Sequence, residues 1–394
     1  MRRTAFHARN VRFEISNFKF AICVLFWPFL WACSTHSAPP TPAPSASPAP
    51  QTQTYARPID RAIADGVAFL ESSQNPNGSW GTGTVTHGNE VEVSVPGSHD
   101  AFRVAVTSLC VIALREAGEH EAHDRGVEFL LSHPDVRRGD AELIYNIWAH
   151  AYIVQALAIE SATNNDPRIR EAISFHLDRM ARYETYTGGW NYYDFDAGAQ
   201  QPAGGPTSFG TAAGLVALYD ARHAGYEISG DMVKRGLRRL AEMRLPNDAV
   251  LYDTDTKYMP LLPANMLRGS IGRAVATDFA MLLWGSPKVD PSACRKALDN
   301  FFREHAALEM GRKTPMPHTS WYQTSGYYYY FDHYYAACLI ELLGPDAKRQ
   351  YAPQLMDVIL PHQEPDGSWW DYPMWDYHKP YGTAFAIMSL LRCR

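Results

Sequence analysis

The sequence predicts an all-α fold, in which six helical hairpins close into an α/α toroid with an inner and an outer ring of helices. The first observation behind this prediction is a set of short apolar segments, because a helix that is apolar on every side is a buried helix. Their irregular spacing suits hairpins with loops of different length rather than an open solenoid of fixed period. The segments are 107–114, 150–157, 211–218, 277–284, 335–342 and 383–390.

The second observation is an amphipathic segment ahead of the buried ones. Ile59, Ile63 and Val67 recur at helical spacing, so they share one face and leave the other face to water. The same spacing recurs at 169–180 and at 233–240. These segments are therefore predicted to form the outer ring.

Two of the outer helices have a recognisable start, at Asp166-Pro167 and at Asp290-Pro291. The aspartate can cap the first free amides of a helix, and proline lacks only an amide hydrogen that the first helical position does not use. We therefore expect helices to begin at these two positions.

The chain divides into three parts: a signal segment at 1–32, a tether at 33–58 and a toroid domain at 59–394. A basic start precedes an apolar run of about 13 residues, which is shorter than the roughly 20 needed to span a bilayer. The stretch that follows is rich in proline and has almost no large apolar side chain, which is typical of an extended tether.

The end of the apolar run, Leu30-Trp31-Ala32-Cys33, resembles a bacterial lipoprotein signal. The resemblance implies that Cys33 is acylated and that the protein is anchored in the cell envelope, on the outer membrane facing the periplasm. Trp31 departs from the pattern, which usually has a small or aliphatic residue there. The alternative is an unmodified Cys33 beside an ordinary cleavage site.

The charge, the cysteine spacing and the absence of common motifs argue against several other classes of protein. The net charge is −6, and acidic and basic residues are interspersed without a basic stripe, so nucleic acid is not an expected partner. Cys110, Cys294, Cys338 and Cys393 have no CxxC spacing and are interpreted as packing residues. Likewise, the sequence contains no GxSxG, HExxH, P-loop or dinucleotide fingerprint.

One short motif occurs twice, as QNPNGSW and as QEPDGSW, and a partial copy without the glutamine ends at Trp190. Its pattern resembles the QW motif of the squalene cyclase and protein prenyltransferase superfamily. The resemblance implies the α/α toroid, and it implies a structural role in which the motif ties outer helices to neighbouring repeats. The motif residues of the two full copies are Gln74, Gly78, Trp80, Gln363, Gly367 and Trp369.

In such toroids the inner helices direct their N-terminal ends at a central cavity, and polar or aromatic residues there are the candidate site. A class II terpenoid cyclase needs a strong general acid and aromatic faces that stabilise a carbocation. Asp332 and Asp100 are the candidate acids, and His333 is a third candidate catalytic residue. The candidate cavity residues are Arg103, Tyr145, Trp148, Arg273, Asp278, Trp321, Tyr322, Tyr328, Tyr329, Trp370, Asp371, Trp375 and Asp376.

The chain departs from both branches of that superfamily. Squalene-hopene cyclases carry Asp-x-Asp-Asp at an inner helix, whereas the nearest string here is 253–256, with threonine in the last place. Prenyltransferases hold zinc with Asp, Cys and His, and Asp332, His333 and Cys338 are the one tempting cluster. On a helix, however, His333 and Cys338 are separated by about 140°. No metal is predicted, and zinc is possible only with distant ligands.

Three functions follow. The leading hypothesis is an isoprenoid- or lipid-handling protein with terpene cyclase-like chemistry. A second is a non-catalytic envelope protein whose rim of Trp370 and Trp375 binds a glycan or a partner protein. A third is a polysaccharide lyase or hydrolase, for which Asp371 and Asp376 among aromatic residues supply the paired acids.

Overall fold

The computed structural model describes residues 59–88, 98–132, 136, 146–191, 205–314 and 328–394. The chain separates into two units, 1–53 and 54–394, and all of the described residues belong to the second unit. These residues are helical, apart from turns, loops and two isolated β-bridges.

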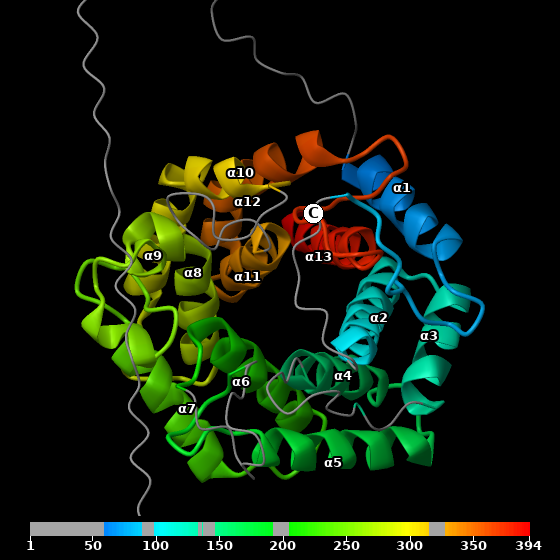
Figure 1. The fold of residues 1–394 in the computed structure, drawn as a ribbon, viewed down its shortest axis with the longest axis horizontal. Coiled ribbons are helices and arrows are strands. Elements are labelled where there is room, and N and C mark those ends of the chain that lie inside the picture. The colour runs from blue at the N-terminus through cyan, green and yellow to red at the C-terminus, as the bar shows by residue number, and fades with distance from the viewer. Residues whose placement is uncertain (1–58, 89–97, 133–135, 137–145, 192–204, 315–327) are drawn as a thin grey trace, which may run out of the picture. The chain divides into compact units, whose positions relative to one another are not determined.

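The described helices alternate between an outer and an inner ring (Figure 1). Each inner helix packs on the next one, and α13 packs on α2, so the inner ring is closed. The inner ring consists of α2 (Ser98–Ala117), α4 (Asn146–Glu160), α6 (Ser208–His223), α8 (Leu267–Leu283), α11 (Tyr329–Leu342) and α13 (His378–Cys393). The outer ring consists of α1 (Ile59–Ser72), α3 (Glu121–Ser132), α5 (Pro167–Arg182), α7 (Gly230–Met243), α9 (Pro291–Arg303) and α12 (Pro345–Ile359), with short α10 (Ala306–Gly311) after α9.

This architecture confirms the predicted α/α toroid of six hairpins. Five of the six predicted apolar segments lie within inner helices, and the sixth, 277–284, extends one residue beyond the end of α8; the residues of these helices are almost all buried. The outer helices are amphipathic, and α5 buries Ile169, Ile173 and Met180 toward the inner ring. Both predicted starts are confirmed, because Asp166 caps the amide of Arg168 at 2.9 Å and Asp290 caps that of Ala293 at 2.8 Å.

Each tryptophan of the repeated motif fastens a hairpin in the same way. The indole nitrogens of Trp80, Trp190 and Trp369 donate to the carbonyls of Leu70, Met180 and Ile359, at 2.7, 2.8 and 3.0 Å. Their backbone amides donate to a threonine hydroxyl on the following inner helix. The threonines are Thr107, Thr211 and Thr383.

The two glutamines connect neighbouring hairpins. The side-chain amide of Gln74 donates to the carbonyl of Ala122 in α3 at 2.8 Å. The amide of Gln363, which follows α12, donates to the carbonyl of Ala62 in α1 at 2.9 Å. Gln363 therefore joins the last hairpin of the ring to the first.

A fourth copy of the turn lies between α7 and α8 and is not visible as a sequence motif. Leu245 and Asp248 form the same two backbone bonds as the turn at 364–369. Asp248 adopts the positive φ of 67° that glycine adopts in the other copies, and Val250 stands where they have tryptophan. The turn geometry therefore recurs without the residues that identify it.

Within the described residues, no helix is long and apolar enough to cross a membrane.

Candidate functional site

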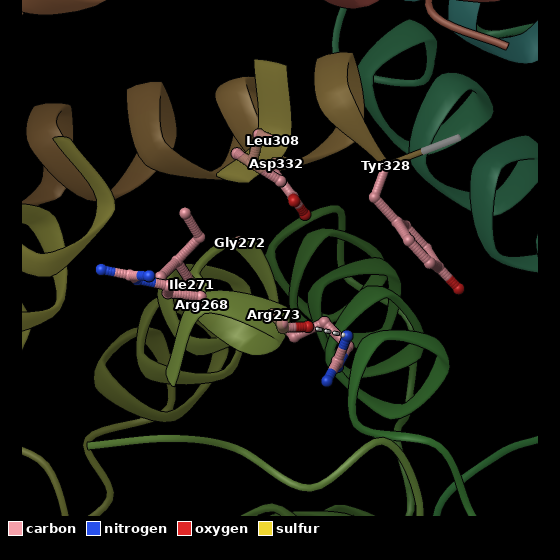
Figure 2. A pocket seen from close by; sticks show the side chains of 8 residues that line it. Arg268, Ile271, Gly272, Arg273, Leu308, Tyr328 and Asp332 are labelled. Carbon is pink, nitrogen blue, oxygen red and sulfur yellow. Dashed lines mark hydrogen bonds between the residues drawn. The ribbon is translucent and has the colours of Figure 1, made fainter. Parts of the chain in front are cut away.

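A small pocket opens where the N-terminal turns of α8 meet α11 (Figure 2). About 220 Å³ of space lies between its lining atoms, and this figure includes part of the open solvent. The enclosed space is far below the roughly 300–1,000 Å³ of a typical small-molecule site, so only a small group of a ligand fits there without rearrangement. Its lining residues are Arg268, Gly269, Ile271, Gly272, Arg273, Leu308, Tyr328 and Asp332.

Asp332 is the acidic group of this pocket. It lies in the first turn of α11, is only 2% exposed, and reaches toward the backbone of α8 (Figure 2). Only glycine fits opposite it, because a Cβ on Gly272 would lie 1.6 Å from the carboxyl carbon of Asp332. The Oδ1 atom is buried without a hydrogen-bond partner among the described residues.

The surroundings of Asp332 favour its neutral form. Burial raises its pKa well above the ordinary value, and the nearby carboxylate of Asp371 raises the pKa further, while Arg273 opposes the shift. A buried carboxyl that keeps its proton can act as a general acid near neutral pH. The direction of the pKa shift of Asp332 is therefore the one that the leading sequence hypothesis requires of its acid.

Arg273 is held by three backbone carbonyls. Its guanidinium donates to Gly269 at 2.8 Å, to Val250 at 3.3 Å and to Ala264, and it lies over the ring of Tyr252. These bonds fix a buried positive charge beside the pocket. That charge would stabilise the carboxylate of Asp332 after the loss of its proton.

Asp371 is another buried carboxyl, but it does not line the pocket. It accepts hydrogen bonds from the Tyr381 hydroxyl and, at 3.1 Å, from the backbone amide of Tyr330. Burial raises its pKa to about 6, and the hydrogen bond from Tyr381 opposes that shift. Asp371 thus links the N-terminal end of α11 to α13.

Aromatic rings from opposite sides of the inner ring meet near the pocket. Trp148 of α4 stacks on Phe209 of α6 with centroids 5.7 Å apart, and Phe209 contacts Tyr328 at 4.9 Å. Phe331 lies 5.8 Å from Trp148 and 5.7 Å from Tyr328. Trp148 and Tyr328 were predicted, whereas Phe209 and Phe331 were missed, although both lie at N-terminal turns of inner helices where the same rule applies.

The predicted rim residues form a separate packed cluster between α2 and α13. Trp375 contacts His99 with ring centroids 4.4 Å apart and is only 3% exposed. Trp370 is half-buried, and the ammonium of Lys313 lies 4.4 Å from its ring centroid. Asp376 is exposed and accepts a hydrogen bond from Thr82 at 3.2 Å.

Asp100 and Arg103 lie at the N-terminal end of α2, beside this rim rather than in the pocket. Both are half-buried. Burial raises the pKa of the neighbouring Tyr377 to about 12, an effect that Arg103 opposes. The structure therefore does not bring the two candidate acids, Asp100 and Asp332, into one pocket lining.

Three further predicted residues lie between the inner and the outer ring of helices. His333 contacts His305 at 2.9 Å, and burial holds the pKa of His333 well below its usual range. Tyr329 donates to the carbonyl of Val358 in α12 at 2.9 Å. Asp278 pairs with Arg244 at 3.0 Å, and burial raises its pKa to about 6.

Some predictions lie outside the described residues, namely Tyr145, Trp321, Tyr322 and Cys33. Within the described ranges, no three His, Cys, Asp or Glu side chains are close enough together to hold a metal ion. The described cysteines, Cys110, Cys294, Cys338 and Cys393, are free thiols.

No protein-family model and no curated protein matches this sequence. Solved structures do resemble it. The cellobiose 2-epimerase of Spirochaeta thermophila is 15% identical, with 85% of this chain and 96% of that chain covered and a TM-score of 0.56. An inactive variant of the α-1,6-mannanase from Salegentibacter sp., in complex with α-1,6-mannotetrose, is 9% identical over 86% and 99% of the chains, with a TM-score of 0.53. A type II terpene cyclase from Scytonema is 16% identical over 84% and 97%, with a TM-score of 0.49.

At these identities the likeness shows the fold alone, an α/α toroid that is shared by enzymes of different chemistry.

Proposed function

We propose that this protein is an acid catalyst that protonates an isoprenoid held among the aromatic rings of the inner helices, with Asp332 as the proton donor. One observation carries the proposal: a buried carboxyl with a raised pKa lines a pocket beside a cluster of aromatic rings. An alkene is a weak base, and its protonation requires a neutral acid and an environment that stabilises a cation.

The chemistry is a redox-neutral isomerisation or cyclisation. The π electrons of the alkene form a new C–H bond with the Asp332 proton, and the O–H bonding pair remains on the carboxylate. The faces of Tyr328 and Phe331 stabilise the carbocation, and Arg273 stabilises the new carboxylate. Loss of a proton from a carbon beside the cationic centre, back to Asp332, forms the product alkene and restores the acid.

Glycan cleavage is the second candidate, because the similar structures with TM-scores above 0.5 include sugar-acting enzymes. A glycoside hydrolase of the usual kind needs two carboxyl groups on either side of the scissile bond. Among the described residues that line the pocket, Asp332 is the sole carboxyl, and Asp371 is engaged by Tyr381 and Tyr330. The pocket therefore supports a single-acid reaction better.

Glycan binding without catalysis is supported less well. A sugar platform needs an open aromatic face, whereas Trp375 is almost fully buried and Trp370 is covered by Lys313. The rim aromatics are accordingly better explained as packing, Trp375 against α2 and Trp370 against His378 of α13 and Lys313.

The test is incubation of the full chain with linear isoprenoids of several lengths and, in parallel, with oligosaccharides, followed by mass spectrometry of the products. We expect an isomerised or cyclised isoprenoid of unchanged mass, and we expect Asp332→Asn to abolish it. Asp376→Asn, a change at an exposed acid outside the pocket, is the control and should retain turnover. Undiminished turnover by Asp332→Asn would remove Asp332 from the mechanism, and shortened sugars would favour glycan cleavage instead.

Acylation of Cys33 and an envelope location stay predictions. Mass spectrometry of the N-terminal peptide from membrane-extracted protein tests both.

A further inference from the structure

The loop between α7 and α8 concentrates the exposed apolar side chains of the described residues. Eight large hydrophobic side chains are exposed in the described part of the chain, and four of them lie in this one loop. Tyr258 is 82% exposed, Leu261 is 78% exposed and Met259 is 58% exposed, and Met266 is the fourth. We name Tyr258, Met259, Leu261 and Met266 the apolar loop patch. Exposed apolar patches of this kind mark interaction surfaces.

The patch is not a product of a loosely held backbone. Asn265 is fully buried, and its side chain accepts from the amide of Tyr252 at 2.7 Å and donates to the carbonyl of Met259 at 3.1 Å. Asp253 accepts from the amide of Thr256 at 2.8 Å. These bonds hold the loop from inside, so its apolar side chains are kept pointing away from the protein.

The side chains beside the patch and the place of the loop indicate its partner. Two exposed charges of opposite sign precede the patch: the carboxylate of Asp255 accepts a hydrogen bond from the amide of Gly205 at 2.8 Å, and the ammonium of Lys257 lies 4.8 Å from the ring centroid of Tyr258. A tyrosine and aliphatic side chains beside a lysine are typical of segments that dip into the interface of a membrane, where the apolar groups enter and the ammonium remains among the headgroups. Arg268, two residues beyond Met266, already lines the pocket.

We propose that the apolar loop patch is a membrane-docking surface, which inserts Tyr258, Met259 and Leu261 into the interface of a lipid bilayer and sets the pocket mouth against it. This surface goes beyond the proposed reaction and does not depend on it. A protein with any pocket ligand, or with none, would dock in the same way. It also does not require acylation of Cys33, although such an anchor would raise the local concentration of the patch at the bilayer.

The test is hydrogen–deuterium exchange of the full chain with and without vesicles of phosphatidylcholine, or of equal parts phosphatidylcholine and phosphatidylglycerol. This readout is local, so attachment through the N-terminal segment does not obscure it. We expect slower exchange at 255–266 when vesicles are present and unchanged exchange at 183–190. The latter turn carries Tyr186, which is 73% exposed and serves as an internal control.

Two matched variants test whether the patch side chains cause the slower exchange. Tyr258→Ser with Leu261→Ser should abolish the slowing at 255–266, because each inserted side chain that is lost weakens the interaction about tenfold. Tyr186→Ser should leave it intact. Equal exchange at 255–266 with and without vesicles would overturn the proposal. Slowing that follows protein concentration in the absence of lipid would overturn it too, since the patch would then bind a second copy of the chain.

Discussion

The carboxyl of Asp332 is buried, and its Oδ1 has no hydrogen-bond partner among the residues that the structure describes. Ionisation of this carboxyl should therefore change the free energy of unfolding. Its folded-state pKa lies above the unfolded value of about 3.9, so the folded protein holds the extra proton between these two pKa values. Stability is unaffected below pH about 4 and falls as the pH rises toward the folded-state pKa.

Asp332→Asn should therefore stabilise the protein in a pH-dependent manner. The amide is neutral at every pH, so the variant avoids this loss, and its advantage should grow by up to about 1.4 kcal/mol per pH unit above pH about 4. Chemical denaturation of both proteins between pH 4 and pH 7 measures the difference. A difference in stability that is constant over this range would show that Asp332 ionises in the folded state as it does in water.

Gly272 should be required for the position of the Asp332 carboxyl, the proton donor that we propose. Alanine would normally strengthen a helix by about 1 kcal/mol relative to glycine, but here its Cβ would occupy the place of the Asp332 carboxyl. We expect Gly272→Ala to lose turnover and to be destabilised by about 1–3 kcal/mol, as in other overpacked cores. Gly230→Ala, at a helical site with nothing within 4 Å of the new Cβ, is the control. Full activity of Gly272→Ala would mean that the carboxyl position is not critical.

At the scale of the elements, the tight turns depend on glycine for two reasons that can be separated. Gly78 has a φ of 87°, and a Cβ there would lie 2.2 Å from the carbonyl oxygen of Arg125 in α3. Gly118 has a similar φ of 83° but open space around it. Gly118→Ala should therefore lower the free energy of unfolding only by the backbone strain that it introduces, about 1–2 kcal/mol, whereas Gly78→Ala should lower it clearly more. Thermal unfolding compares the two, and equal losses would mean that α3 moves away at little cost.

The elements also show which parts of the fold a sequence can reveal. The inner helices were predicted because burial on all sides leaves an unbroken apolar run. The turn after α7 was not, because Asp248 replaces glycine and Val250 replaces tryptophan, although the backbone bonds of the turn are kept. The amide of Val250 donates to the hydroxyl of Ser270 at 3.1 Å, so Ser270 takes the place of the threonines that bind the tryptophan amides elsewhere.

At the scale of the whole molecule, the candidate site was predictable in place but not in detail. The N-terminal ends of the inner helices do carry Asp332, Tyr328 and Trp148 toward one another. His333 and Asp278, by contrast, face the outer ring. A sequence shows that a helix is buried on every side, but which side faces the centre depends on how the ring closes. That closure is set by contacts between residues far apart in the chain.

The closure of the helical ring should be measurable in an unfolding experiment. Gln363 and Gln74 make matching bonds to Ala62 and Ala122, but the bond from Gln363 joins the end of the chain to its beginning, 301 residues apart. If the ring unfolds as one unit, Gln363→Ala and Gln74→Ala should each lower the free energy of unfolding by about 1–2 kcal/mol without changing the denaturant slope.

If the ring instead opens at its seam, Gln363→Ala alone should produce a second, earlier transition. Denaturant unfolding followed by circular dichroism and by tryptophan fluorescence separates these outcomes, because Trp369 and Trp80 are bonded to the helices on either side of the seam. We expect the two signals to coincide in both variants, since α13 packs against both α1 and α2 and one glutamine bond is a small part of that interface.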